Sequence, residues 1–213
     1  QLSPYDPLNA VMTESLQEPS SAHLFGTDKL GRDLLSRVIF GTRTSLIMTL
    51  CLVAVIFVIG TFLGVIAGYF GGVVDAVIMR IADMMISFPG LVLAIAIAGM
   101  LGPNLVNAVI SIAAVSWTKY ARLARSMVLK VKKSLYIEAA IVNGTKTWKI
   151  LLVHILPNMV TQMVVTAAAD IGTMMLELAS LSFLGFGATA PTPEWGLMLN
   201  EGRTYMAKAP WLM

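Results

Sequence analysis

The chain has 213 residues, of which 57% are hydrophobic and 13% are charged, and its mean hydropathy is +0.78. Soluble domains have roughly a quarter of their residues charged, so this chain has too few polar groups to cover a globule of its size. The same figures exclude disordered and collagen-like chains, and a single cysteine, Cys51, excludes a scaffold held by internal disulfides. The placement of the charges indicates a membrane protein.

The first segment, residues 1–44, is expected to be extracytoplasmic or interfacial. Residues 1–25 contain no Lys or Arg and no apolar core, so they do not resemble a secretory signal peptide. Gly31–Thr44 is predicted to lie as an amphipathic helix at the membrane interface. The chain starts with Gln and stops within an apolar phrase, which favours further sequence at both ends.

Three long runs without Asp, Glu, Lys or Arg follow, between Arg43 and Asp75, Asp83 and Lys119, and Lys149 and Asp170. A spanning helix needs roughly 20 mostly apolar residues. The first run predicts a span near Ser45–Tyr69. The second is divided by the turn signal of residues 101–104 (Leu-Gly-Pro-Asn) into two spans, and the third begins a span near Ile150 that continues towards Gly187. We therefore expect four spans.

Small and charged residues suggest how these spans pack. Gly60, Gly64 and Gly68 share one helix face, which would let another helix approach closely. The Phe88-Pro89-Gly90 phrase should kink the second span, because proline lacks an N–H. Just before it lie three charged residues that we expect to pair with one another: Asp75, Arg80 and Asp83.

Two acids lie within the last predicted span. Asp170 and Glu177 are two helical turns apart and therefore share a face. Acids within a membrane are costly and usually face a cavity or a partner. They are candidate lining residues of a substrate path; the alternatives are structural pairing with a neighbouring helix, or a shallow, hydrated position. Trp117 and Tyr120 suit the aromatic belt at a helix end. The residue spacings indicate no metal site and no nucleic-acid partner.

The connection at 119–149 is predicted to be cytoplasmic, because it holds eight of the fifteen Lys and Arg residues and one acid, Glu138. Its first part, Lys119–Lys133, reads as a basic extension of the third span. Tyr136–Val142 reads as a short helix, Gly144 as a left-handed turn, and a second helix leads to Pro157. Such a helical hairpin could dock in another protein's groove or rest on lipid headgroups.

This stretch resembles the EAA loop of binding-protein-dependent ABC importer permeases. The matching residues are Glu138, Ala139, Ala140, Gly144, Leu156 and Pro157. His154 stands where the general pattern has Ile, although His-Ile-Leu-Pro-Asn is typical of the dipeptide/oligopeptide/nickel branch. Phrases at 23–37, 181–187 and 191–196 are also similar to the C-type permease subunit of that branch. Two segments, at 170–176 and 189–192, show a weaker resemblance to the nickel permeases of that branch.

The resemblance implies an all-α membrane protein with the type I ABC importer transmembrane domain, of whose six helices the four central ones would lie within residues 45–213. It also implies a sister permease subunit, two cytoplasmic ATPase subunits that bind ATP and Mg²⁺, an extracytoplasmic binding protein, and an inner-membrane location. The six matching residues would then form the ATPase-coupling site within the loop at 119–149.

The function expected on this basis is ATP-driven uptake of nickel, as a chelate; the alternative is the same role for di- and oligopeptides. The chain has no Gly-x-x-x-x-Gly-Lys-Ser/Thr loop, so ATP hydrolysis is assigned to another subunit. An ATPase-independent channel or secondary transporter would predict charged pore rings or inverted repeats, and neither is evident. An intramembrane enzyme would need a catalytic or metal-ligand cluster such as His-Glu-x-x-His, which is missing from the sequence.

Overall fold

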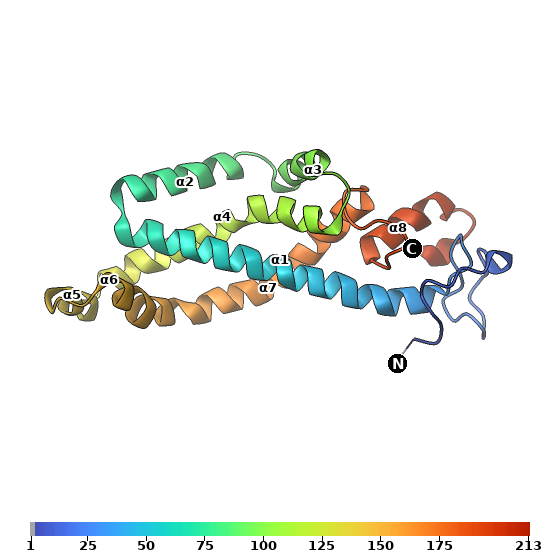
Figure 1. Cartoon of the computed structure of the whole chain (residues 1–213), viewed down its shortest axis with the longest axis horizontal. Helices are drawn as coiled ribbons and strands as arrows, with labels where there is room; N and C mark the ends of the chain where they lie inside the picture. Colours follow the sequence, from blue (N-terminus) through green and yellow to red (C-terminus); the bar gives the residue numbers. More distant parts are fainter. Residues whose placement is uncertain (1–2) are drawn as a thin grey trace. The chain divides into compact units, whose positions relative to one another are not determined.

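The computed structural model describes residues 3–213, which form helices joined by turns; an isolated bridge between Thr27 and Asp33 is the only extended pairing in this range. The all-α prediction is confirmed. The elements, drawn in Figure 1, are η1 (Met12–Glu14), α1 (Leu34–Phe70), α2 (Gly72–Ile86), α3 (Gly90–Leu101), α4 (Leu105–Lys132), α5 (Leu135–Val142), α6 (Thr147–Lys149), the π-helical η2 (Ile150–Ile155), α7 (Leu156–Phe183), α8 (Trp195–Gly202), η3 (Arg203–Tyr205) and η4 (Pro210–Leu212).

Within residues 3–213, two helices are long and apolar enough to cross a membrane. They are α1 and the continuous helix Thr147–Phe183, and α2 with α3 adds a third if that pair, bent by 92° at its break, is one span. The expected count of four spans is therefore not confirmed. The helix that falls short is α4, because its charge-free part ends at Thr118, before the roughly 20 residues that a span requires.

The helix boundaries agree with the predicted breaks. α1 ends at Phe70 and α2 starts at Gly72; both glycines of the Gly71-Gly72 turn have positive φ. The Pro89 phrase separates α2 from α3 completely rather than kinking one helix. At its start α1 differs from the prediction: it begins at Leu34 and continues without a break into the apolar run, so Gly31–Thr44 is no separate interfacial helix.

The chain divides into two compact units. Unit 1 comprises residues 1–51, 94–111 and 173–213, and unit 2 comprises residues 52–93 and 112–172. α1, α3, α4 and α7 each contribute residues to both units.

Unit 1 is organised around a buried group of charges. The Asp28 carboxylate accepts hydrogen bonds from Arg32 Nε at 2.7 Å and Arg37 Nη1 at 3.0 Å, and the Glu201 carboxylate accepts from the same two guanidinium groups. The two arginines are only 2% and 1% exposed. Their charges are therefore neutralised inside the unit, which joins the segment before α1 to the end of α8.

Unit 2 contains the close helix contact that the glycine spacing predicts. A Cβ on Gly60 would lie 2.5 Å from the carbonyl oxygen of Trp117, and one on Gly64 would overlap the carbonyl oxygen of Ala121. A Cβ on Gly68 would lie 2.8 Å from the Cβ of Val128 and 3.0 Å from the carbonyl oxygen of Arg125, both also in α4. The glycine face of α1 therefore lies directly on the backbone of α4.

We expect Gly64→Ala to destabilise this packing, because the added methyl group has backbone rather than a flexible side chain in its way. Overpacking of this kind costs about 1–3 kcal/mol. The matched control is Gly172→Ala in α7, where a Cβ meets no atom within 4 Å and the change should be neutral or stabilising. The measurement is thermal unfolding of the purified protein in detergent; equal melting temperatures for the two variants would contradict the close packing.

Candidate functional site

The segment after α4 forms a helical hairpin, defined here as residues 134–149, which lies at the end of unit 2 in Figure 1. α5 matches the predicted short helix. At its end the Gly144 N–H donates to the Ile141 carbonyl and the Thr145 N–H donates to the Ala140 carbonyl. This is the Schellman arrangement, which needs a left-handed residue after the helix, and Gly144 has φ of 72°. The turn is therefore fixed by its own backbone hydrogen bonds.

The role of Gly144 is conformational and not steric, because a Cβ there would meet no atom within 4 Å. Glu138 and Ala139 are exposed and Ala140 is half-buried. Glu138 lies in the first turn of α5, where a carboxylate is favoured by the helix dipole. Its side chain is thus available to a partner.

The hairpin also exposes apolar side chains that a water-facing loop would not need. Leu135 is 82% exposed and Val142 87%, and Trp148 is 59% exposed. Ile137 of α5 and Ile150, at the start of η2, are buried, and α5 packs against η2. The apolar patch of the hairpin, as we call it, consists of Leu135, Tyr136, Ile141, Val142 and Trp148. Exposed apolar groups of this kind indicate an interaction surface.

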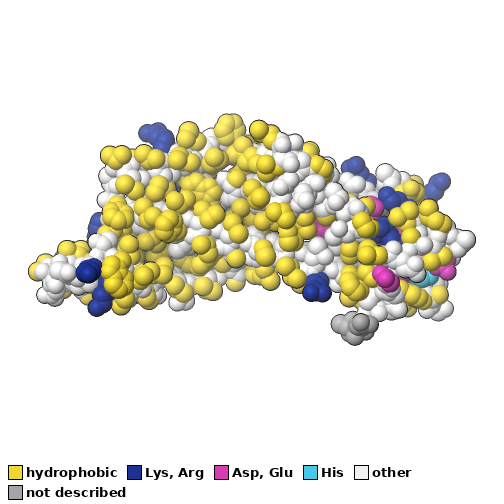
Figure 2. Space-filling model, in the orientation of Figure 1, with side chains coloured by type: hydrophobic (Ala, Val, Ile, Leu, Met, Phe, Trp, Pro, Cys, Tyr) yellow, Lys and Arg dark blue, Asp and Glu magenta, His cyan; other side chains and the backbone are white. Residues whose placement is uncertain are grey.

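The hairpin and the end of α4 also carry exposed lysines. Lys130, Lys133, Lys146 and Lys149 are exposed, and Figure 2 shows basic side chains close to this end of the molecule. Lys132 differs, because its ammonium donates to the Tyr69 carbonyl at 2.6 Å and lies 5.2 Å from the Tyr69 ring centre. The hairpin therefore presents apolar side chains together with positive charge, with Glu138 as its acid.

Leu156 and Pro157 begin α7 directly after the π-helical segment η2. Proline has no N–H to donate and crowds the carbonyl four residues earlier. The wider π geometry, in which the Leu156 N–H donates to the Leu151 carbonyl, lets the helix continue through this point. Sequence analysis missed η2; its signal is the proline inside a run that is otherwise helical.

The two acids of α2 pair with arginines of α4. This is contrary to the prediction that Asp75, Arg80 and Asp83 pair with one another. Arg125 binds both carboxylate oxygens of Asp75 through Nε and Nη2, and Arg122 pairs with Asp83. The arginines are one turn apart on α4. The basic residues after Thr118 thus hold α2 against α4.

Asp170 is 5% exposed and has two partners on α4: Lys119 Nζ at 2.6 Å and Tyr120 Oη at 2.9 Å. This is the structural pairing with a neighbouring helix that the sequence left open. Tyr120 is fully buried, so its assignment to an aromatic belt is wrong. Glu177 lies on the same helix and is half-buried; a path-lining role for the two acids remains a prediction.

Comparison with known proteins identifies the family. Residues 60–212 match the model of the binding-protein-dependent transport system inner membrane component. The chain is 47% identical to the glutathione transport system permease protein GsiD of Pectobacterium atrosepticum, over 98% of this chain and 70% of that protein. It is 46% identical to the dipeptide transport system permease protein DppC of Alkalihalophilus pseudofirmus, over 92% and 64%.

The nickel transport system permease protein NikC of Escherichia coli is 39% identical over 97% of this chain and 75% of its own length. The chain thus spans about two thirds to three quarters of these relatives. Their shared description confirms the resemblance drawn from Glu138–Pro157 and the type I ABC importer fold. The chain belongs to the binding-protein-dependent inner membrane components, the permease subunits of ABC importers, which are membrane subunits and not enzymes.

Proposed function

We propose that this chain forms half of the membrane path of an ATP-driven uptake system for short peptides. The other half would be a sister permease subunit, and an extracytoplasmic binding protein would deliver the solute. Two ATPase subunits on the cytoplasmic side would bind ATP and Mg²⁺ and perform the hydrolysis. This assignment includes an inner-membrane location with the hairpin facing the cytoplasm.

The observation that carries the proposal is the hairpin. It has a hydrogen-bonded turn at Gly144 and an exposed acid at Glu138. It also has an apolar patch that no other described part of the chain covers. A groove on an ATPase subunit would cover this patch, and the exposed lysines would select an acidic rim. Buried Ile137 and Ile150 would carry a movement of the hairpin into α4 and α7.

The movement would be a rigid-body one. Closure of the ATPase pair on ATP would displace the hairpin, and the paired helices would follow as a block because Lys119 and Asp170 tie α4 to α7, while Arg122 and Arg125 tie it to α2. Interfaces and packed cores of this kind switch between arrangements rather than deform continuously. Uptake would thus be coupled to hydrolysis mechanically.

The substrate class rests on the relatives. Two that share 46–47% identity are named for glutathione and dipeptide transport, and the one named for nickel shares 39%. The preference for nickel drawn from residues 170–176 and 189–192 is therefore not confirmed, and we place peptides first. Nickel is the second candidate, supported by NikC and by those two phrases.

Cross-linking tests the docking surface. With Cys51 replaced by Ala, Val142→Cys should form a cross-link to an ATPase subunit through a short bifunctional thiol–amine reagent, because Val142 is 87% exposed within the apolar patch. The matched control is Met100→Cys, which is 88% exposed at the end of α3 and should give no such product. Equal yields at the two positions, or a product only at position 100, would contradict the assignment.

Substitution at Gly144 tests coupling. Gly144→Val should reduce ATP-driven uptake about tenfold or more in proteoliposomes, because a β-branched residue strongly disfavours positive φ and would shift the turn. Gly144→Asn is the matched control, since Asn tolerates the left-handed conformation and should keep most of the uptake. Both rates are compared with ATP hydrolysis by the same importer. Wild-type uptake in the Val variant would remove Gly144 from the coupling mechanism.

Transport assays decide the substrate. Vesicles that contain the complete importer and its binding protein should accumulate a radiolabelled dipeptide or glutathione in an ATP-dependent manner, and ⁶³Ni²⁺, offered alone or with a chelator, should not compete. ATP-dependent nickel accumulation without peptide uptake would favour the second candidate. Uptake that persists without the ATPase subunits would instead support a channel or a secondary transporter.

A further inference from the structure

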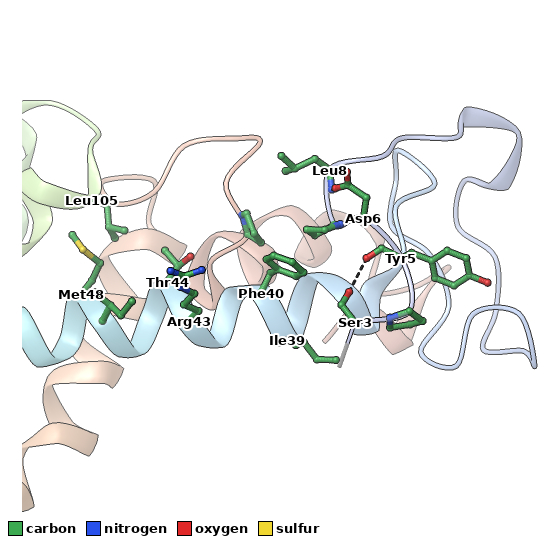
Figure 3. A pocket seen from close by; sticks show the side chains of 14 residues that line it. Ser3, Tyr5, Asp6, Leu8, Ile39, Phe40, Arg43, Thr44, Met48 and Leu105 are labelled. Carbon is green, nitrogen blue, oxygen red and sulfur yellow. Dashed lines mark hydrogen bonds between the residues drawn. The ribbon is translucent and has the colours of Figure 1, made fainter. Parts of the chain in front are cut away.

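A groove of about 1050 Å³ lies in unit 1 beside the first turns of α1. One wall is the segment 3–8 and the other is a face of α1, with Leu105 and Pro193 at the edge. Figure 3 shows the two walls and the side chains between them. Pockets for small ligands have roughly 300–1,000 Å³, so this groove has room for a long molecule. The coupling hairpin belongs to unit 2, so the groove is a separate feature.

The α1 wall is apolar. Its side chains recur at the spacing of one helix face, as Ile39 and Phe40, then Ile47 and Met48. Phe40 is 42% exposed and Ile47 is 47% exposed. They belong to a helix that is long and apolar enough to cross a membrane. The natural contact of such an exposed face is a hydrocarbon chain and not water.

One cation, Arg43, interrupts this apolar wall, midway between the two apolar pairs. It is exposed, and it is the last charged residue before the long run that ends at Asp75. Among the described residues it makes no ion pair and no hydrogen bond, whereas Arg32 and Arg37 of the same unit are buried in carboxylate pairs. A guanidinium left open beside an apolar groove at the start of a spanning helix has the chemistry of an anionic headgroup site.

The opposite wall does not neutralise Arg43. Its only acid, Asp6, accepts the Leu8 N–H at 2.9 Å and lies beside Leu8, along the helix from Arg43, in Figure 3. Ser3 donates its hydroxyl to the Tyr5 carbonyl at 2.6 Å, the dashed line in the same view. These polar groups bond within the segment itself and not with Arg43, so the positive charge that the groove offers to a ligand is the guanidinium.

We propose that this groove binds one anionic phospholipid. An acyl chain lies along Ile39, Phe40, Ile47 and Met48, and the lipid phosphate accepts hydrogen bonds from the planar guanidinium of Arg43. A free phosphate would use only the cation. A zwitterionic phospholipid also offers its phosphate, but its choline cation is repelled by the guanidinium, so the site prefers a lipid with a net negative headgroup. The inference depends on the membrane location of α1 and is independent of the transported solute.

The test is lipid retention by the purified importer with all its subunits, measured by native mass spectrometry in detergent with phosphatidylglycerol or phosphatidylcholine of identical chains. Wild type should retain phosphatidylglycerol preferentially. Arg43→Gln should lower that retention about tenfold, the effect of losing one charge-assisted contact of about 1.5 kcal/mol, and should lower phosphatidylcholine retention less. Arg80→Gln, at an exposed arginine of α2, is the matched control and should behave as wild type.

A second variant tests the apolar wall. Met48→Trp should fill the groove and lower retention of both lipids, and glycerol phosphate added in solution should displace neither. If Arg43→Gln fails to assemble, as judged by size-exclusion chromatography, Arg43→Lys keeps the charge and should show a partial loss.

Three outcomes would overturn the proposal. Unchanged phosphatidylglycerol preference in the Arg43 variants would remove the cation from the site. Unchanged retention in Met48→Trp would place the lipid elsewhere. Wild-type protein that retains neither lipid would mean that another polypeptide segment covers the groove.

Discussion

The pairing of charges on α4 is the constraint on which the arrangement of unit 2 depends. This helix leaves its apolar stretch at Thr118 and then presents Lys119, Arg122 and Arg125 within two turns. Each is matched by a carboxylate, Lys119 by one from α7 and the two arginines by two from α2. Charge pairing thus positions α2 and α7 around α4. The glycines of α1 let that helix approach α4 closely without an ion pair.

The same helix connects to the hairpin, and this explains how an exposed element could act on buried ones. The hairpin is internally rigid because the Schellman turn at Gly144 satisfies the end of α5, and it is anchored by Ile137 and Ile150. The π segment η2 then carries the chain past Pro157 without a break in the helix. A displacement of the hairpin therefore reaches α7 through continuous helical backbone, and not through a flexible loop.

Unit 1 contains both paired and unpaired arginines within the described chain. Its buried arginines, Arg32 and Arg37, form ion pairs with Asp28 and Glu201. These pairs fix the segment before α1 to the end of α8. Arg43, two turns further along α1, has no such carboxylate in the described chain. One helix thus carries arginines that stabilise the fold and, at the start of its apolar run, an arginine that is available to a ligand.

The sequence by itself determined the features that depend on nearby residues. The break at Gly102-Pro103 and the left-handed turn at Gly144 were predicted correctly, and Pro89 was recognised as an interruption although it separates two helices instead of kinking one, because positive φ and the missing proline N–H act locally. The glycine face of α1 was also predictable, since helical spacing shows which residues share a side. The position of the short helix of the hairpin followed from the same local signals, whereas its motif residues came from the resemblance to the permease family.

Only the tertiary structure decided which charges meet. Asp75 pairs with Arg125 and Asp170 with Lys119, about fifty residues apart, and helical periodicity holds no information on such distant partners. Likewise, the extent to which Leu135 and Val142 are exposed depends on what packs around the hairpin. Local rules fix the conformation of a segment, whereas pairing and burial are properties of the surfaces that folding brings together.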